Sequence, residues 1–258
     1  MTLDVSDLTA DSSAMNQSTA KHQSVAMLVI GNEVLSGRTR EANGWLVAQK
    51  MFNKGCKLSE IAVVPDQHSA IITTLNRLRK QYDAVITSGG IGPTHDDITM
   101  ESIAAAFSVE LIEHRFIVEA MTAHFGKEGL NDGRRRMTRV PEGAKLIRCE
   151  KTIAPGAHIA NVYILAGVPD IFSSQLEAIL NDFGDTPFLR QEIAVELPES
   201  LFAAPLEAIQ LQFNDVEIGS YPGRCGPSPS GKICLSSQYP ERLQQALNSV
   251  KEMLAPYL

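Results

Sequence analysis

Short apolar runs alternate with longer segments of helical periodicity from residue 25 onward, and this alternation constrains the fold of the chain. The runs at residues 25–30, 58–64, 84–88 and 162–166 are typical of buried strands. The segments between them carry apolar residues at the three- and four-residue spacing of helices. Strands that alternate with helices form βαβ units, whose strands run parallel in one sheet. The sequence therefore predicts an α/β fold with a mostly parallel sheet.

Changes of pattern divide the chain into three parts. Residues 1–23 are rich in Ser, Thr, Asp and Gln and lack the basic start and apolar core of a signal peptide, so we expect a disordered tail. The α/β pattern occupies residues 24–185. Residues 186–258 return to short strands and helices, which predicts a small α+β domain with a flexible hairpin connection at 221–231.

Composition excludes several classes of protein. The net charge of −7, from 23 Lys plus Arg against 30 Asp plus Glu, gives no long-range attraction for nucleic acid. The longest apolar run near the N-terminus, residues 25–30, is far shorter than the roughly 20 residues that span a bilayer, so no membrane segment is expected. The four cysteines stand singly, which disfavours a zinc site and fits a reducing, cytoplasmic location.

A glycine-rich turn joins the predicted strand 84–88 to a predicted helix at 98–107. It begins at Ser88 and contains Gly89, Gly90 and Gly92. Because glycine has no Cβ, the N–H groups of such a turn can converge on an anion at the start of a helix, which predicts a phosphate site. Close packing of strand against helix is the alternative use of these glycines.

Three polar residues follow the glycines: His95, Asp96 and Asp97. Two carboxylates beside an anion site would repel the anion unless a divalent cation lay between them, so the pair predicts a metal. The alternative is that Asp97 or Thr99 caps the following helix. The role of His95 stays open, because neutral imidazole is a poor ligand for magnesium.

Further candidates lie outside this turn. Glu33 follows the first strand at the carboxyl edge of the sheet, where α/β proteins bind ligands, although a lone acid there is also typical of a solvated turn. Asn43 begins the first helix and either caps it, which physics favours, or contacts a ligand. Residues 151–156, KTIAPG, are expected to form a loop able to hold a ring or a phosphate.

A local basic patch stands out in this acidic chain. A solvated surface is the favoured interpretation, and an arginine that reaches a phosphate is the alternative. The patch consists of Arg134, Arg135, Arg136 and Arg139.

Several segments together resemble the MoaB/Mog domain family of molybdenum-cofactor biosynthesis. They are GNEVLSGRTREAN (31–43), SGGIGPTHDDIT (88–99), APG (154–156), LAGVP (165–169) and GSYP (219–222). Within the family they are most similar to the N-terminal domain of competence/damage-inducible protein A and to the hydrolytic domain fused to eukaryotic FAD synthase. The resemblance implies a three-layer, MogA-like α/β/α sandwich that is usually a homo-oligomer.

The resemblance implies three candidate functions. The first is a nucleotide pyrophosphatase that splits ADP-ribose or FAD with the help of Co²⁺ or Mg²⁺ and of K⁺. The second is a protein that binds molybdopterin or transfers an adenylyl group to it. The third is a regulatory domain that binds a nucleotide without catalysis.

By motif position, the resemblance also assigns site residues. Asp96 and Asp97 would be the metal and catalytic carboxylates. Residues from Gly89 to Thr94, with Ser88 before them, would form the phosphate cradle. The remaining ligand contacts would be Glu33, Asn43 and Gly156.

The chain departs from the family pattern in two places. Ala157 and His158 follow the APG segment, where the family often has an aromatic or bulky residue, so the resemblance leaves open whether a base or pterin stacks there. The sequence ends at Leu258, without the amidase domain of full-length competence proteins. Deamidation of a nicotinamide nucleotide is therefore not expected.

Overall fold

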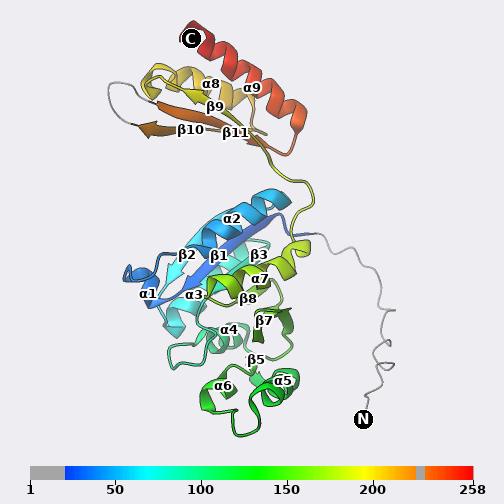
Figure 1. Ribbon diagram of the computed structural model, residues 1–258. Coiled ribbons are helices and arrows are strands. Elements are labelled where there is room, and N and C mark those ends of the chain that lie inside the picture. Colours follow the sequence, from blue (N-terminus) through cyan, green and yellow to red (C-terminus); the bar gives the residue numbers. More distant parts are fainter. Residues whose placement is uncertain (1–20, 225–229, 258) are drawn as a thin grey trace, which may run out of the picture.

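A six-stranded sheet forms the centre of the larger part of the molecule (Figure 1). The computed structural model describes residues 21–224 and 230–257. In sheet order the strands are β2 (Lys57–Val64), β1 (Ser24–Ile30), β3 (Ala84–Ser88), β8 (Val162–Leu165), β7 (Thr152–Ile159) and β6 (Lys145–Cys149). The first four run parallel, and β7 runs antiparallel to both of its neighbours. The predicted α/β fold with a mostly parallel sheet is confirmed.

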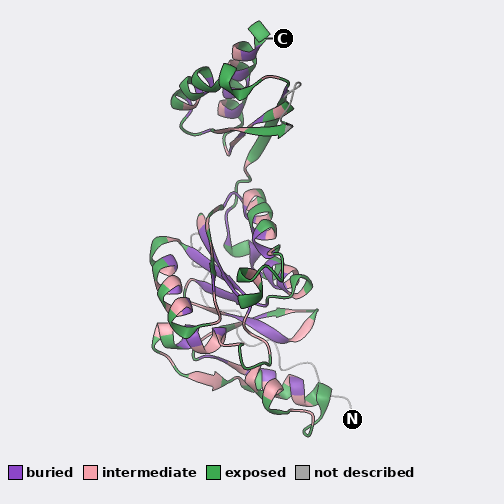
Figure 2. Cartoon of the chain, turned by 90° about the vertical axis from the view of Figure 1, so that its left-hand side faces the viewer, coloured by how far each residue is buried: buried purple, intermediate pink, exposed green. Residues whose placement is uncertain are grey.

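Helices cover both faces of the sheet. On one face lie α2 (Asn43–Lys54) and α7 (Pro169–Ile179), and on the other lie α3 (His68–Gln81), α4 (Thr99–Phe107) and α5 (Arg115–Phe125). Alternate residues of β1 from Val25 to Ile30 enter the two cores, and this run is apolar throughout, as is typical of a strand buried on both sides. Figure 2 shows this buried strip between exposed outer helix faces.

Several short elements were not foreseen from the sequence. They are α1 (Asn32–Leu35), β4 (Leu111–Glu113), β5 (Arg139–Pro141) and β6. The sequence of residues 126–139 is compatible with a mobile connection or a short surface helix, and the structure has the helix α6 (Asp132–Arg136) there. The prediction that residues 151–156 form a loop is wrong, because most of this segment lies in β7. Proline and glycine disfavour strands, but a Cβ on Gly156 would lie only 2.5 Å from Ile164 O, so close pairing of β7 with β8 requires glycine here.

The C-terminal residues form a second, smaller α+β unit. Its antiparallel sheet has the order β10 (Glu217–Arg224), β11 (Ser230–Ser237) and β9 (Leu189–Val195). Helices α8 (Ala203–Gln212) and α9 (Pro240–Leu254) pack on this sheet around a core of their own. Residues 225–229 of the predicted hairpin connection lie outside the described residues. Short 3₁₀ turns complete the secondary structure at Leu180–Asp182, Glu199–Leu201 and Ala255–Tyr257.

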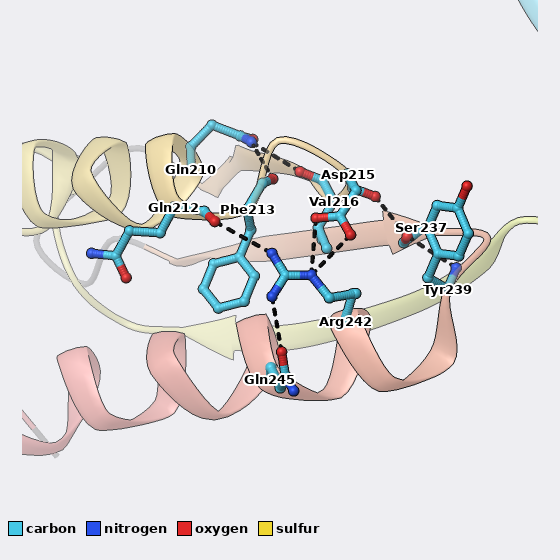
Figure 3. A network of polar contacts seen from close by, with 9 residues as sticks. All are labelled: Gln210, Gln212, Phe213, Asp215, Val216, Ser237, Tyr239, Arg242 and Gln245. Atoms are coloured by element: carbon cyan, nitrogen blue, oxygen red, sulfur yellow. Dashed lines mark hydrogen bonds and ion pairs between the residues drawn. The ribbon is translucent and has the colours of Figure 1, made fainter.

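A polar network fixes the turn between α8 and β10 (Figure 3). The Arg242 guanidinium lies 4.7 Å from the centre of the Phe213 ring, and its Nε donates to Asp215 Oδ2 at 2.9 Å. Ser237 Oγ donates to Asp215 O at 2.6 Å. Because every polar group in this network contacts another part of the same unit, we assign the network to stability.

The two parts meet through a few side chains. Phe52 and Phe188 pack with ring centroids 5.3 Å apart, and Gln238 Nε2 donates to Gly55 O at 3.0 Å and to Thr186 O at 2.7 Å. Residues 1–20 of the expected tail lie outside the described residues. His22, which we also expected in the tail, is held on the larger part, since its N–H donates to Asp182 O at 3.0 Å.

Within residues 21–224 and 230–257, none of the helices is long and apolar enough to cross a membrane. The expected homo-oligomer and the expected cytoplasmic location stay predictions.

Candidate functional site

The glycine turn lies where the carboxyl ends of β1, β3 and β8 meet. Gly89 N–H donates to Leu165 O at 3.3 Å, and a Cβ on Gly89 would lie 2.3 Å from Ile30 O. Gly89 also has a φ of +100°, a conformation that side chains rarely adopt. The turn therefore packs against all three strand ends, and only glycine fits at position 89.

Thr99 anchors the other end of the turn. Its N–H donates to Gly90 O and its Oγ1 donates to Gly89 O, both at 2.9 Å. Gly90, with φ +68°, leaves room for that hydroxyl, because a Cβ there would lie 2.2 Å from Thr99 Oγ1. The residue that caps α4 is Ile98, without a side-chain bond, so the interpretation of Asp97 or Thr99 as a helix cap is wrong.

Three consecutive N–H groups of the turn are available to a ligand. Those of Gly90, Ile91 and Gly92 have no acceptor among the residues that the structure describes. They stand before α4, a helix of 9 residues, in a turn where Gly89 and Gly90 both have positive φ. Consecutive unpaired N–H groups in such a turn form a concavity for anions, which supports the predicted phosphate cradle.

Thr94 brings the two aspartates of the motif together. Its Oγ1 lies 2.6 Å from Asp96 Oδ1 and 2.6 Å from Asp97 Oδ2, and its N–H donates to Asp97 Oδ2 at 2.8 Å. The bond from the Thr94 hydroxyl holds the pKa of Asp96 below its usual range. His95 is 94% exposed, with Nδ1 4.0 Å from Asp96 Oδ1, and makes no closer polar contact in the described chain. The two carboxylates therefore share one hydroxyl beside the cradle.

A third carboxylate, Asp66, was missed by the sequence analysis. It follows β2, and its Oδ2 accepts the Asn32 N–H at 2.8 Å. Burial raises the pKa of Asp66, and the nearby charges of Glu33 and Asp96 raise it further. The position of Asp66 in the sequence could have identified it, because it stands just past the end of its strand, as Glu33 does after β1. Asp66, Glu33 and Asp96, which follow three different strands, thus lie close enough for their charges to interact.

The donor set limits what kind of metal site is possible. Among residues 21–224 and 230–257, no group of three or more His, Cys, Asp or Glu side chains is arranged to hold a metal ion. Magnesium, however, commonly binds through one or two carboxylates together with substrate phosphates. Asp96 and Asp97 fit a site of this kind, in which phosphate oxygens of the ligand complete the coordination of the ion.

Asn43 is a bridge between strand ends and does not cap its helix. Its Nδ2 donates to Ser88 Oγ and to Gly167 O, both at 2.9 Å, and the residue is only 6% exposed. The helix start is bonded instead by Glu41, whose carboxylate accepts the Gly44 N–H at 2.9 Å. The prediction of capping is therefore wrong, and Asn43 holds the start of the glycine turn against the loop after β8.

The structure separates the members of the basic patch. Arg134 stacks on Phe125 and Arg135 pairs with Glu113, so neither is directed at the glycine turn. Arg136 and Arg139 line a small cavity beside the turn. The complete lining consists of Gly90, Ile91, Gly92, Asp97, Met100, Glu101, Leu111, Arg136, Met137, Arg139 and Pro155.

The cavity also clarifies where the remaining predicted residues lie. Pro155 reaches it from β7, whereas Gly156 faces Ile164 O and Gln175 inside the sheet layer. Glu33 is exposed, with its carboxylate folded back over Gly31. The structure thus brings together the glycine turn, Thr94, Asp96 and Asp97, with Glu33 at the acidic edge and Gly156 outside the cavity.

Comparisons with known proteins cover both parts of the chain. A family model described as a probable molybdopterin binding domain matches residues 26–191, and one described as the middle domain of FAD synthase matches residues 187–258. A protein of Pyrococcus furiosus is 31% identical over 214 residues, covering 76% of this chain and 84% of that protein. A probable FAD synthase of Caenorhabditis elegans is 29% identical over 269 residues, covering 92% of this chain and 51% of that protein.

One solved structure extends these similarities to the fold. The CinA protein of Thermoplasma acidophilum, described as having unknown function, superposes with a TM-score of 0.59 at 27% identity. The match covers 62% of this chain and 97% of that chain. The arrangement of the central sheet and its helices is therefore shared with a protein of known structure.

Proposed function

The chain belongs to the family of probable molybdopterin binding domains, the MoaB/Mog family, and within it we propose a metal-dependent hydrolase that cleaves the diphosphate linkage of a nucleotide. One observation carries the proposal. Asp96 and Asp97 share the Thr94 hydroxyl directly beside unpaired N–H groups that suit a phosphate. Two ionised carboxylates next to a phosphate are unfavourable unless a cation lies between them, and cleavage of a diphosphate uses that arrangement.

Different residues of the turn would have different roles in such a reaction. The N–H groups of residues 90–92 bind phosphoryl oxygens and stabilise the charge that develops on them. The Thr94 hydroxyl lowers the pKa of Asp96, and Asp96 is exposed, so that its carboxylate can accept a hydrogen bond from an attacking water. A divalent ion on Asp96 and Asp97, with Co²⁺ or Mg²⁺ as candidates, would supply neutralisation of the diphosphate charge.

The FAD synthase similarities support a flavin or adenine dinucleotide as the first substrate to test. The C-terminal residues match the FAD synthase middle domain, and the C. elegans relative is named a probable FAD synthase. The chain spans about half of that relative, 51% of its length, so synthesis of FAD is not part of the proposal. Hydrolysis of FAD or ADP-ribose is compatible with a site that has both a phosphate cradle and paired carboxylates.

The decisive experiment measures AMP release by the purified chain. The substrates are ADP-ribose, FAD and NAD, each with Co²⁺, Mg²⁺ or Mn²⁺ and with or without K⁺. We expect metal-dependent release of AMP that Asp97→Asn abolishes without loss of the folded circular dichroism spectrum. Glu252→Gln, which makes the same charge change on an exposed position of α9, is the matched control and keeps full activity. Unchanged turnover in Asp97→Asn would defeat the proposal.

A second candidate is supported by the family description. A site that binds molybdopterin would use the same cradle for the pterin phosphate, with or without adenylyl transfer. Retention of molybdopterin by the purified protein, or loss of molybdoenzyme activity on gene deletion, would favour it. A purely regulatory nucleotide domain, the third candidate, predicts thermal stabilisation by ADP-ribose with no product formed.

A further inference from the structure

We infer that Arg136 and Arg139 form an anion subsite, which binds a phosphoryl group of an organic diphosphate against the glycine turn. The inference rests on the proposed function for the identity of the ligand. The cavity that carries it is lined by Gly90 and Gly92 of the turn and by the two arginines, together with Asp97 and Glu101. A phosphoryl group in this cavity would meet N–H donors of the turn and of the guanidinium groups.

Arg139 has donors that the protein does not use. Its Nη2 pairs with Glu101 Oε1 at 2.7 Å, which fixes the guanidinium in place. Its Nε is buried and has no hydrogen-bond partner in the described part of the chain. A buried donor without an acceptor costs free energy, and such groups in native structures call for an explanation. An anionic ligand in the cavity that Arg139 lines would offer an acceptor to this guanidinium.

Arg136 is the second arginine that lines the cavity. It is half-buried, and it makes no ion pair or side-chain hydrogen bond with any residue that the structure describes. Its neighbours behave differently, since Arg134 lies 3.9 Å from the centre of the Phe125 ring and Arg135 lies 3.2 Å from Glu113. Of the four arginines of the patch, Arg136 and Arg139 are the two that line the cavity, and neither stacks on an aromatic ring among the described residues.

The segments that carry these arginines are fixed relative to the turn. A Cβ on Gly133 would lie 3.3 Å from Pro93, so α6 packs directly on the glycine-turn loop. Arg139 opens β5, opposite Glu113 of β4, and is tied to α4 through Glu101. A subsite built on such supports needs little rearrangement of its backbone when it binds, which favours affinity.

The arrangement of charges indicates a ligand with two phosphoryl groups. Guanidinium groups bind phosphate oxygens with paired, charge-assisted bonds, so the arginine side attracts one phosphoryl group directly. Asp96 and Asp66 lie near each other outside the lining of this cavity, and such an acidic group attracts a phosphoryl group only through a cation. We therefore expect a diphosphate, with one phosphoryl group for the arginines and one for the cation, to bind more tightly than a nucleoside without phosphate.

Calorimetric titration with inorganic pyrophosphate and with ADP-ribose tests the subsite. We expect Arg136→Gln and Arg139→Gln each to weaken both ligands roughly 10- to 150-fold, the range of one charge-assisted hydrogen bond. Lysine at either position should restore part of the loss, because it keeps the charge without the planar fork. Arg135→Gln is the matched control and binds like the wild type.

Several outcomes would overturn the inference. They are affinities within about twofold of wild type in both glutamine variants, an equal loss in Arg135→Gln, or a wild-type protein that binds neither ligand. Arg136 makes no side-chain bond within the described part of the chain, so its variant tests the subsite even if Arg139→Gln fails to fold. AMP release is scored separately. Binding that depends on the arginines, without AMP release, would refute the hydrolase and support the subsite. AMP release with binding that does not depend on the arginines would refute the subsite and support the hydrolase.

Discussion

Replacing Asn43 with alanine removes the only side-chain link between the start of the glycine turn and the loop after β8 that the described chain shows. The lost Nδ2 serves two acceptors at 2.9 Å, Ser88 Oγ and Gly167 O, and the residue is 6% exposed, so water does not readily replace it. A buried acceptor left without a donor costs about 1–3 kcal/mol. The Ser88 hydroxyl can rotate, whereas the Gly167 carbonyl cannot, and we therefore expect a total loss of about 2–4 kcal/mol.

Thermal unfolding followed by circular dichroism measures this loss. For a domain of this size, about 3 kcal/mol corresponds to a fall in Tm of roughly 6–12 °C. The matched variant is Asn161→Ala, which removes an Nδ2 that donates to Arg79 O at 3.0 Å and to Tyr82 O at 3.3 Å near the opposite ends of the strands. Asn161 is only half-buried, so its loss should be nearer 1 kcal/mol.

The two asparagine variants must also differ in ligand binding. Asn43→Ala loosens the turn that carries the cradle and should weaken pyrophosphate binding, whereas Asn161→Ala should leave that affinity unchanged. A loss of stability below about 1 kcal/mol in Asn43→Ala would show that neither acceptor depends on this side chain. Equal loss of affinity in both variants would show that Asn43→Ala affects binding only because it lowers the stability of the whole fold.

Three further predictions concern single side chains. Thr94→Val removes the hydroxyl shared by the aspartates and should lower metal-dependent turnover roughly 10- to 100-fold at nearly constant Tm, and turnover equal to wild type would contradict the assigned role. His95→Ala should leave turnover nearly unchanged, because the side chain is 94% exposed, so a large loss would make His95 part of the reaction. The hydrogen bond from Arg77 lowers the pKa of Glu60 in the folded state. The stability that this bond adds is therefore present above the pKa of Glu60 in the unfolded chain, roughly 4.3, and is lost as the pH falls through the lower pKa of the folded state. Arg77→Gln should therefore flatten the fall of Tm between roughly pH 5 and 3, and an identical pH profile would contradict this.

Much of the fold could be predicted because it depends on residue patterns that are local. The apolar run that became β1 is buried on both faces, and the helical spacing of Ile71, Leu75 and Leu78 gave α3. The elements that were missed are short or break local rules. β7 contains Pro155 and Gly156, and its strand conformation is stabilised by pairing with β6 and β8, which no local pattern records.

The candidate site could be predicted in its centre and not at its edges. The glycines and aspartates are adjacent in sequence, so their chemistry was visible there. The role of Asn43 depends on acceptors 45 and 124 residues away along the chain. The selection of Arg136 and Arg139 from four clustered arginines likewise depends on tertiary contacts, because their neighbours find partners in Phe125 and Glu113.

Hydrogen exchange at the unpaired N–H groups of the cradle can report whether a ligand occupies the site. An amide proton without an acceptor exchanges with solvent deuterium far more readily than one in a hydrogen-bonded helix or strand. The amides of Gly90, Ile91 and Gly92 should thus exchange quickly in the empty protein, although they sit against a tightly packed sheet. An anion that accepts from them should slow that exchange whether it is a nucleotide, a pterin phosphate or pyrophosphate, so occupancy can be followed before any turnover is known.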